Sequence, residues 1–388
     1  MNILYIATYE GLSGASFSLL GLVLEMQKQK NNVHVVLLKD GKLKKLLEEN
    51  HVPYTIVKGY PWVIRQRFQS SLKKRILWYI KKICNRVAER SIQNLICNEK
   101  FDIVHINAST AGVGAIAAKK AGIPVVWHIR EFVEEDLEKV FLDKEESLSL
   151  ISQSDAVIAI SQSVYQKFYP LMTDANFHVI YNGIDQKSYL AGRTRLLFSE
   201  KIVKITIAGR IDPAKGHMDL LKAAFLLKQD GYTDFCIQIA GVSQNAAYEQ
   251  SLKAFIKEKQ MEDMISFLGF CTNLPAILLD SDISVVSSRM EAFGRVTVES
   301  MMAGNVVVGA DSGGTSELLQ NQYGILYECG SAESLAEQLR YVLTHREKMA
   351  ETANIARKYA LFSFTSEKNA ADILNLYHQL KFGGAYHE

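Results

Sequence analysis

The sequence predicts an α/β protein made of two doubly wound domains. Short apolar runs rich in β-branched residues alternate with longer segments of helical periodicity along all 388 residues, and this alternation is typical of βαβ units with parallel strands. The runs are apolar almost throughout, so we expect sheets that are covered by helices on both faces. The length itself favours more than one domain.

The predicted strands form two groups, one in each half of the chain. They are 2–7, 33–38, 102–106, 124–128 and 156–160 in the first half, and 202–208, 235–240, 264–268, 282–286 and 306–309 in the second. The halves also share a motif, because 154–161 and 281–287 both place Ser-Asp before an apolar run. This echo indicates two domains of similar build, with the polar stretch 182–201 as the linker between them.

The composition is that of an ordinary globular protein in a reducing compartment. Hydrophobic residues make up 48% and charged residues 22% of the chain, which excludes long disordered or fibrous segments. The five cysteines are scattered without a C-x-x-C motif, so we expect reduced thiols rather than zinc ligands or disulfides. Residues 1–7 resemble a first buried strand rather than a signal peptide. We therefore expect a cytoplasmic protein without a spanning segment.

Residues 291–304 carry the strongest functional signal. Glu291 and Glu299 stand eight residues apart, after the predicted strand 282–286, and the apolar spacing that follows Gly294 predicts a helix. The start of a helix offers free N–H groups and a positive dipole end, which suit a phosphate. A carboxylate on each side can accept hydrogen bonds from hydroxyl groups. A nucleotide-diphospho-sugar has this combination, because its diphosphate lies between a ribose diol and the hydroxyl groups of the sugar.

This segment resembles the E-x-F-G-x(4)-E signature of the retaining glycosyltransferases of family 4, which have the GT-B fold. The resemblance implies that Glu291 contacts the donor sugar and Glu299 the ribose, with Phe293 and Gly294 beside them in the donor site. Arg295 departs from the family pattern, which commonly has an apolar residue there, and it would add a cation near the phosphates.

The resemblance covers nearly the whole chain and implies its domain organisation. Residues 1–185 would form a Rossmann-like acceptor domain, and 186–365 a Rossmann-like domain for the nucleotide-sugar donor. The two would face each other across a cleft. The last helix, in 366–388, would pack back on the first domain.

A second motif follows the first predicted strand of the second half. Arg210 and Lys215 stand five residues apart, just before Gly216 and a predicted helix, as in the G-R-x(4)-K-G motif of the family. Loss of a diphosphate leaving group builds negative charge, which two cations can stabilise in place of a metal. We therefore expect no metal. The D-x-D tripeptide 280–282 begins a strand, at the wrong end of the sheet for a metal site.

The first half offers weaker candidates. Gly14 lies in a glycine-containing turn that opens a helix, where the backbone can approach a ligand closely; the family has a small-residue loop there, near donor and acceptor. His128 ends a predicted strand, which should point its side chain toward the cleft, and the family often has a histidine there, close to the reacting centre. His105 and Asn107, at the end of the preceding strand, are candidates for acceptor contacts.

Residues 65–90 form a predicted basic amphipathic helix. Nine basic side chains stand against one acid in this segment: Arg65, Arg67, Lys73, Lys74, Arg75, Lys81, Lys82, Arg86 and Arg90. Apolar residues recur among them at helical spacing, with Trp62 nearby. This pattern is typical of helices that bind an anionic membrane surface. A helix that turns its apolar side to the core has the same pattern, and a nucleic-acid partner has no supporting motif.

Together these motifs predict a retaining, metal-independent hexosyltransferase. It would move a sugar from a UDP- or GDP-linked donor to a lipid-linked or polysaccharide acceptor, at the inner face of the cell membrane, without a cofactor. His128, Arg210, Lys215 and Glu291 would be the catalytic residues. A nucleotide-sugar epimerase of related build would convert the donor without an acceptor. A scaffold with a dead site would bind the donor only, which the intact Arg/Lys and Glu/Glu pairs argue against.

Overall fold

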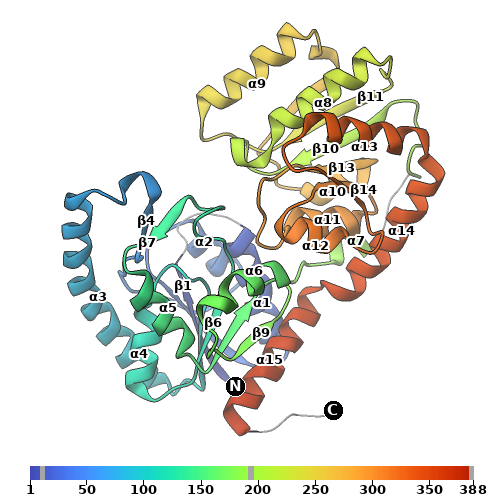
Figure 1. Ribbon diagram of the computed structural model, residues 1–388. Coiled ribbons are helices and arrows are strands. Elements are labelled where there is room, and N and C mark those ends of the chain that lie inside the picture. The colour runs from blue at the N-terminus through green and yellow to red at the C-terminus, as the bar shows by residue number, and fades with distance from the viewer. Residues whose placement is uncertain (9–13, 191–195, 384–388) are drawn as a thin grey trace. The chain divides into compact units, whose positions relative to one another are not determined.

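The computed structural model describes residues 1–8, 14–190 and 196–383, except for the side chains of residues 74 and 75, and divides the chain into two compact units (Figure 1). Unit 1 consists of Met1–Gly183 and Ser366–Glu388, and unit 2 of Ile184–Thr365. Each unit contains a parallel sheet with helices packed against it. This confirms the predicted fold class.

The sheet of unit 1 has seven strands among the described residues, in the order β3-β2-β1-β5-β6-β8-β9, and every pairing is parallel. The strands are β1 (Asn2–Ala7), β2 (Asn32–Leu37), β3 (Tyr54–Ile56), β5 (Ile103–Ile106), β6 (Val125–Ile129), β8 (Ala156–Ala159) and β9 (Phe177–Val179). The strand order reverses between β1 and β5. Two further strands, β4 (Val63–Arg65) and β7 (Lys139–Phe141), form a separate antiparallel pair.

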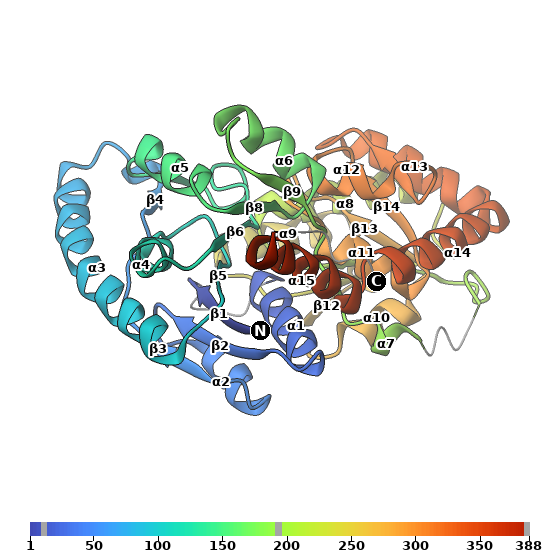
Figure 2. The same cartoon turned by 90° about the horizontal axis from the view of Figure 1, so that it is seen from below.

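Two groups of helices cover this sheet. The first is α1 (Gly14–Lys28), α2 (Lys42–Glu49) and the last helix, α15 (Ser366–Phe382); the second is α3 (Leu72–Glu99), α4 (Val113–Ala121), α5 (Lys144–Ser152) and α6 (Gln162–Phe168), with the 3-10 turns η1 (Gln66–Phe68) and η2 (Tyr169–Leu171). Helix α15 packs beside α1 (Figure 2). It places Ile373, Leu376 and Tyr377 in the core formed with α1 and β1.

Unit 2 repeats this plan with a parallel sheet of six strands among its described residues, in the order β12-β11-β10-β13-β14-β15. The strands are β10 (Val203–Ala208), β11 (Phe235–Ala240), β12 (Ile265–Gly269), β13 (Ile283–Val286), β14 (Val306–Ala310) and β15 (Ile325–Tyr327). The strand order reverses between β10 and β13. Ligands of open α/β sheets bind at the carboxyl ends of the strands beside such a reversal.

The helices of unit 2 also form two groups, because right-handed crossovers on either side of the reversal place them on opposite faces of the sheet. They are α7 (Lys187–Leu190), α8 (His217–Gln229), α9 (Ala246–Glu258), α10 (Leu274–Asp280), α11 (Arg295–Ala303), α12 (Gly313–Leu319), α13 (Ala332–Thr344) and α14 (Arg346–Ser363), with η3 (Pro213–Lys215) and η4 (Glu262–Met264). Helices α8, α9 and α13 cover one core of buried strand residues. Helix α11 packs against α14 and α10.

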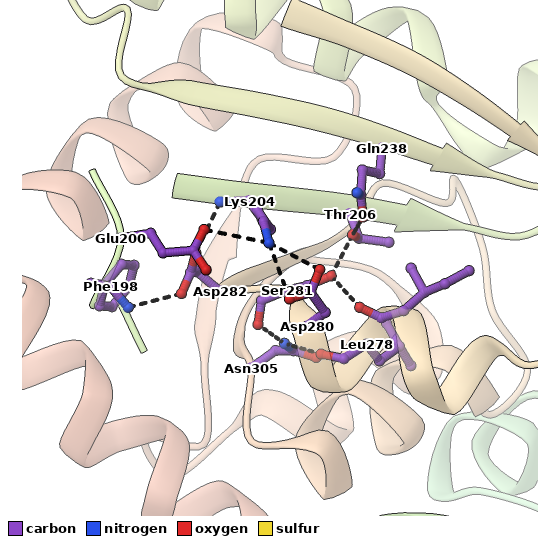
Figure 3. A network of polar contacts seen from close by, with 11 residues as sticks. Phe198, Glu200, Lys204, Thr206, Gln238, Leu278, Asp280, Ser281, Asp282 and Asn305 are labelled. Carbon is purple, nitrogen blue, oxygen red and sulfur yellow. Dashed lines mark hydrogen bonds and ion pairs between the residues drawn. The ribbon is translucent and has the colours of Figure 1, made fainter. Parts of the chain in front are cut away.

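Aspartates anchor the amino ends of strands in both sheets. Asp282, just before β13, accepts a hydrogen bond from the backbone N–H of Lys204 at 2.9 Å, and the Lys204 ammonium lies 3.0 Å from Asp280 (Figure 3). In unit 1, Asp155 precedes β8 and accepts a hydrogen bond from the Val125 N–H at 2.8 Å. The D-x-D tripeptide therefore braces the start of a strand, at the opposite end of the sheet from the loops that follow β10 and β13.

Candidate functional site

An ion pair between Lys215 and Glu291 joins the two loops beside the strand-order reversal of unit 2. Lys215 ends η3, after β10, and Glu291 lies in the loop after β13. The Lys215 Nζ and the Glu291 Oε1 are 2.6 Å apart, and each side chain is 21% exposed. The Ser287 hydroxyl also donates to the Lys215 carbonyl at 2.9 Å. Two sequence motifs that lie 76 residues apart therefore form one charged site.

Glycines allow close backbone approaches around this ion pair, between the loops after β10 and β13 and between the latter loop and helix α12. Gly216 has φ +68°, and a Cβ there would lie 2.1 Å from the Ser287 carbonyl oxygen. A Cβ on Gly314 would lie 2.4 Å from the Phe293 carbonyl oxygen, and the Gly314 N–H donates to the Glu291 carbonyl at 2.7 Å. Any larger residue at either position would separate the loops and move Lys215 or Glu291.

Helix α11 begins directly behind this pair and holds Glu299. Gly294 forms its N-cap with φ +87°, and the buried Phe293 ring packs against Phe364 at 5.9 Å between centroids. Glu299 is buried and forms an ion pair with Arg295, one turn earlier, at 3.0 Å between Oε1 and Nε. Burial raises the pKa of Glu299, and the Arg295 guanidinium opposes that shift. A ribose hydroxyl bound by Glu299 would share the carboxylate with Arg295.

Arg210 is the more exposed cation of the predicted donor site. It follows β10, its side chain is 49% exposed, and its Nε lies 3.5 Å from the Asp212 carboxylate. Asp212 also caps η3 by accepting a hydrogen bond from the Ala214 N–H at 3.0 Å. Arg210 and Lys215 thus lie at the two ends of one short loop.

In unit 1, the predicted residues His105, Asn107 and His128 lie together in a buried polar cluster with Arg130 and Tyr377. His105 Nε2 and His128 Nδ1 are 3.2 Å apart. Arg130 contacts His128 Nδ1 at 3.1 Å through Nη2, and it donates from Nε to the Asn107 Oδ1 at 2.8 Å. The Tyr377 hydroxyl lies 2.6 Å from His105 Nδ1.

Arg130 and Tyr377 are not among the residues that the sequence motifs predict for a site. Arg130 directly follows β6, so a charged residue after an apolar run could have indicated it. Tyr377 stands 272 residues from His105, and no local pattern in the sequence indicates this contact. The His128 imidazole is fully buried rather than open to a cleft. It shares the face of Val126, whose side chain belongs to the core that α15 covers. Burial, aided by the Arg130 charge, lowers the pKa of both His105 and His128 well below 6.5.

These shifts predict that acid destabilises unit 1. The histidines of the unfolded chain bind protons below about pH 6.5, while His105 and His128 stay neutral in the folded protein, so stability falls as the pH drops below that value. Each histidine contributes a slope of up to about 1.4 kcal/mol per pH unit. Urea unfolding between pH 7 and pH 5 should show a smaller slope for His105→Gln than for the wild type or for His51→Gln, a change at an exposed histidine. Equal slopes for all three proteins would contradict this prediction.

The remaining predictions for the site concern Gly14 and metals. Gly14 is the exposed first residue of α1, and residues 9–13 of its turn lie outside the described part of the chain. Within that part, no three His, Cys, Asp or Glu side chains are grouped as metal ligands would be. None of the described helices combines the length and the apolar character that crossing a membrane requires.

Comparison with known proteins assigns the family. The family described as Glycosyltransferase Family 4 matches residues 12–188, and the one described as Glycosyl transferases group 1 matches residues 193–359. The two matches together extend over most of both units. The chain belongs to the family 4 glycosyltransferases with the GT-B fold.

Two relatives and one solved structure illustrate the likeness. N-acetyl-alpha-D-glucosaminyl L-malate synthase of Bacillus anthracis is 27% identical over 249 residues. The aligned part is 59% of this chain and 61% of that protein, so the chain spans less than two thirds of this relative. UDP-Gal:alpha-D-GlcNAc-diphosphoundecaprenol alpha-1,3-galactosyltransferase of Escherichia coli is 24% identical over 275 residues, 64% of this chain and 68% of that one. The structure of Anabaena Alr3699/HepE in complex with UDP has a TM-score of 0.79 at 23% identity and covers 97% of this chain and 99% of its own.

Proposed function

We propose that this protein is a retaining glycosyltransferase that moves a sugar from a UDP-sugar to a lipid-linked acceptor. The observation that carries the proposal is the ion pair of Lys215 and Glu291 beside the strand-order reversal of unit 2. Two of the similar proteins support UDP as the nucleotide: one is named as a UDP-galactose enzyme, and the other was solved with UDP. The diphosphoundecaprenol acceptor in the name of the Escherichia coli relative supports a lipid-linked acceptor.

The charged groups of unit 2 suit the chemistry of this transfer. The bond between the anomeric carbon and the β-phosphate oxygen breaks, and Lys215 and Arg210 stabilise the charge that builds on the phosphate. The acceptor oxygen forms the new bond on the same face of the sugar, and its proton passes to the departing phosphate. Because this route needs no protein nucleophile, we assign none. It also needs no metal, since the two cations take that role.

The ion pair prepares Lys215 and Glu291 for the donor. When no donor is bound, the charges of Lys215 and Glu291, which are both mostly buried, neutralise each other at 2.6 Å. An incoming β-phosphate offers the Lys215 ammonium a new anion, and a sugar hydroxyl offers the Glu291 carboxylate a new donor. The bound substrate therefore replaces one contact by two, without leaving a buried charge unpaired.

Helix α3 supports a membrane-bound acceptor. Six large side chains on one of its faces are between 53% and 71% exposed: Leu72, Ile76, Tyr79, Ile80, Ile83 and Val87. They recur at helical spacing and form a continuous exposed apolar stripe. These apolar side chains therefore do not face the core of unit 1, and the alternative of a helix that turns its apolar side to the core is wrong for this stripe. Trp62 is not part of it, because Trp62 is buried and stacks on Trp127 at 5.7 Å between centroids.

Cations line a groove next to the apolar stripe. The groove, of about 410 Å³, is lined by Tyr79, Lys82, Ile83, Arg86, Glu89, Arg90 and Lys120. Lys82 and Lys120 form ion pairs with Glu146 and Glu89, whereas Arg86 makes none among the described residues, and neither does Arg90. Unneutralised guanidinium groups beside exposed apolar side chains match the phosphates and acyl chains of an anionic bilayer. We therefore infer that α3 docks unit 1 on such a membrane.

Thermal stability measured with a panel of nucleotide sugars tests the proposed function. A ligand present at 100 times its Kd stabilises the folded state by about 2.7 kcal/mol, so UDP-sugars should raise the unfolding temperature and GDP- and ADP-sugars should not. With a lipid-diphosphate-linked sugar as acceptor, the protein should release UDP and form a product that keeps the anomeric configuration of the donor, as NMR would show. Conversion of the donor without an acceptor would indicate an epimerase instead, and binding without turnover a scaffold. An inverted product would contradict retention.

A further inference from the structure

Helix α11 begins with an ion pair that the helix itself does not favour. Arg295 is its first residue, and Glu299 follows one turn later. The Arg295 Nε and the Glu299 Oε1 lie 3.0 Å apart. A cation in the first turn opposes the helix dipole, and a cation four residues before an acid is the weaker order of such a pair. The stability of α11 therefore does not explain why an arginine occupies this position.

Burial distinguishes this pair from the other ion pairs between side chains four residues apart. The Glu299 side chain is 11% exposed, whereas the acid of each other such pair between described residues is at least 31% exposed. Burial disfavours a charged carboxylate and raises the pKa of Glu299, and the Arg295 guanidinium opposes this shift. Arg295 is therefore the charge that favours the ionised form of Glu299.

The charge of Glu299 matters for the ribose contact that is predicted for it. A carboxylate can accept hydrogen bonds from both hydroxyl groups of a ribose, whereas a protonated carboxyl group has fewer acceptor sites. Hydrogen bonds to a charged acceptor are also about twice as strong as those between neutral groups. A buried Glu299 without a cation beside it would therefore lose its hold on the ribose as the pH falls.

We propose that Arg295 is a positioning residue, which holds Glu299 in place as a charged carboxylate so that the donor site recognises the ribose of the nucleotide. The binding of the ribose by Glu299 rests on the proposed function. The charge of Glu299 in the ligand-free protein does not, because it depends only on contacts within unit 2. The ion pair thus gives Arg295 a different role from that of a cation at the phosphates, which the sequence suggested.

Calorimetry with UDP and with 2′,3′-dideoxy-UDP tests this role. Arg295→Leu should weaken the binding of UDP by about tenfold, the difference between a charged and a neutral hydrogen-bond acceptor. It should not weaken the binding of dideoxy-UDP, which has no ribose hydroxyl groups. In the transfer assay the loss should appear in the KM for the donor rather than in kcat, since the ribose lies away from the bond that breaks.

Three further variants separate this role from a structural one. Arg295→Lys keeps the cation and should recover most of the affinity for UDP. In a Glu299→Gln background, Arg295→Leu should have no further effect, because a neutral amide needs no cation beside it. Arg340→Leu is the matched control, because it breaks an ion pair with Asp230, at the other end of α8 from the loop after β10. This variant should bind UDP as the wild type does.

The pH dependence of binding gives a second readout. Without Arg295, Glu299 should bind a proton at a higher pH, so the loss of UDP affinity in Arg295→Leu relative to the wild type should grow from pH 8 to pH 6. Two other titratable groups lie close by. Burial and the Glu299 charge raise the pKa of Tyr189 on α7, and Arg357 on α14 donates to the Tyr189 carbonyl at 2.9 Å. Neither group titrates in this range.

The ionisation of Glu299 can also be measured without a nucleotide. Carbon NMR of protein with 13C-labelled glutamate carboxyl groups follows their titration, and Glu299→Gln identifies the signal. Glu299 should stay ionised to a lower pH in the wild type than in Arg295→Leu. Equal titration in both proteins would overturn the proposal, as would an equal loss of affinity for UDP and dideoxy-UDP. A wild type that binds no UDP would refute the UDP donor of the proposed function, and the NMR titration would then decide the role of Arg295.

Discussion

Replacing Lys215 by alanine should lower the rate of sugar transfer by about a hundredfold, the usual effect of losing one group that stabilises transition-state charge. In the proposed mechanism the substitution removes a cation from the leaving phosphate, and it leaves the Glu291 carboxylate, which lies 2.6 Å from the Lys215 ammonium, without its partner. Initial rates of UDP release at saturating donor measure the effect. Lys257→Ala, at an exposed lysine of the same unit, is the control and should transfer at the wild-type rate.

Two further measurements separate catalysis from structure at this pair. Glu291→Gln keeps the shape of the side chain, and it should also lose activity. If the two groups act as a unit, the double variant should be hardly worse than Lys215→Ala. Activity should survive EDTA, because the cations that we propose for the leaving group are the side chains of Arg210 and Lys215. Complete loss in EDTA that Mg²⁺ or Mn²⁺ restores would contradict this assignment, as would a Lys215→Ala enzyme of near-normal rate.

Neutralising the cations of α3 should release the protein from anionic vesicles. Each basic residue at the surface of an anionic membrane contributes about 1 kcal/mol of attraction, so Lys73→Gln, Arg86→Gln and Arg90→Gln together should weaken binding by about a hundredfold. Ile76→Ser with Ile83→Ser should weaken it independently, by removing the apolar contacts. Both residues are more than half exposed, so neither change should unfold the helix. Co-sedimentation with vesicles rich in phosphatidylglycerol, at low and high salt, measures the binding.

The matched control lies on another helix of unit 1. Lys42, Lys44 and Lys45 on α2 give the same loss of charge when changed to Gln, and that variant should still bind. Transfer to a short soluble acceptor should be normal in both triple variants, because the residues that we propose to bind the donor are in unit 2. Equal binding of the wild type to neutral and anionic vesicles, or binding to neither, would show that α3 is an ordinary solvated helix.

The main strands could be predicted from the sequence, and the short edge strands could not. All ten predicted strands are present, each with both ends within one residue of the predicted position. The sheet edges β3, β9 and β15, with three residues each, were missed because most of their residues are only partly buried. A strand without a fully apolar run has little to distinguish it from a loop.

The sequence motifs name the residues of the predicted donor site, but they do not show which of these residues contact one another. The motifs predict that Lys215 and Glu291 lie on loops, but their spacing in the sequence does not show that they form an ion pair. It also does not show that Arg295 forms an ion pair with Glu299. The apolar stripe of α3 has the same period whether it faces the core or solvent, so only the packing decides between them. Tyr377 meets His105 because α15 covers the sheet, and a contact so distant along the chain leaves no local signal.

The division of the chain into units also affects the order in which the protein can fold during synthesis. Unit 2 is one continuous segment, Ile184–Thr365, whereas unit 1 takes its last core residues from Ser366–Glu388. The first and last residues of unit 2 lie side by side, because the Ile184 N–H donates to the Phe364 carbonyl at 2.9 Å. The segment made second can therefore fold completely on the ribosome, while the segment made first still lacks α15. Until that helix emerges, the face of the sheet around Tyr5 and His105 stays uncovered, and this interval is when a chaperone has most to protect.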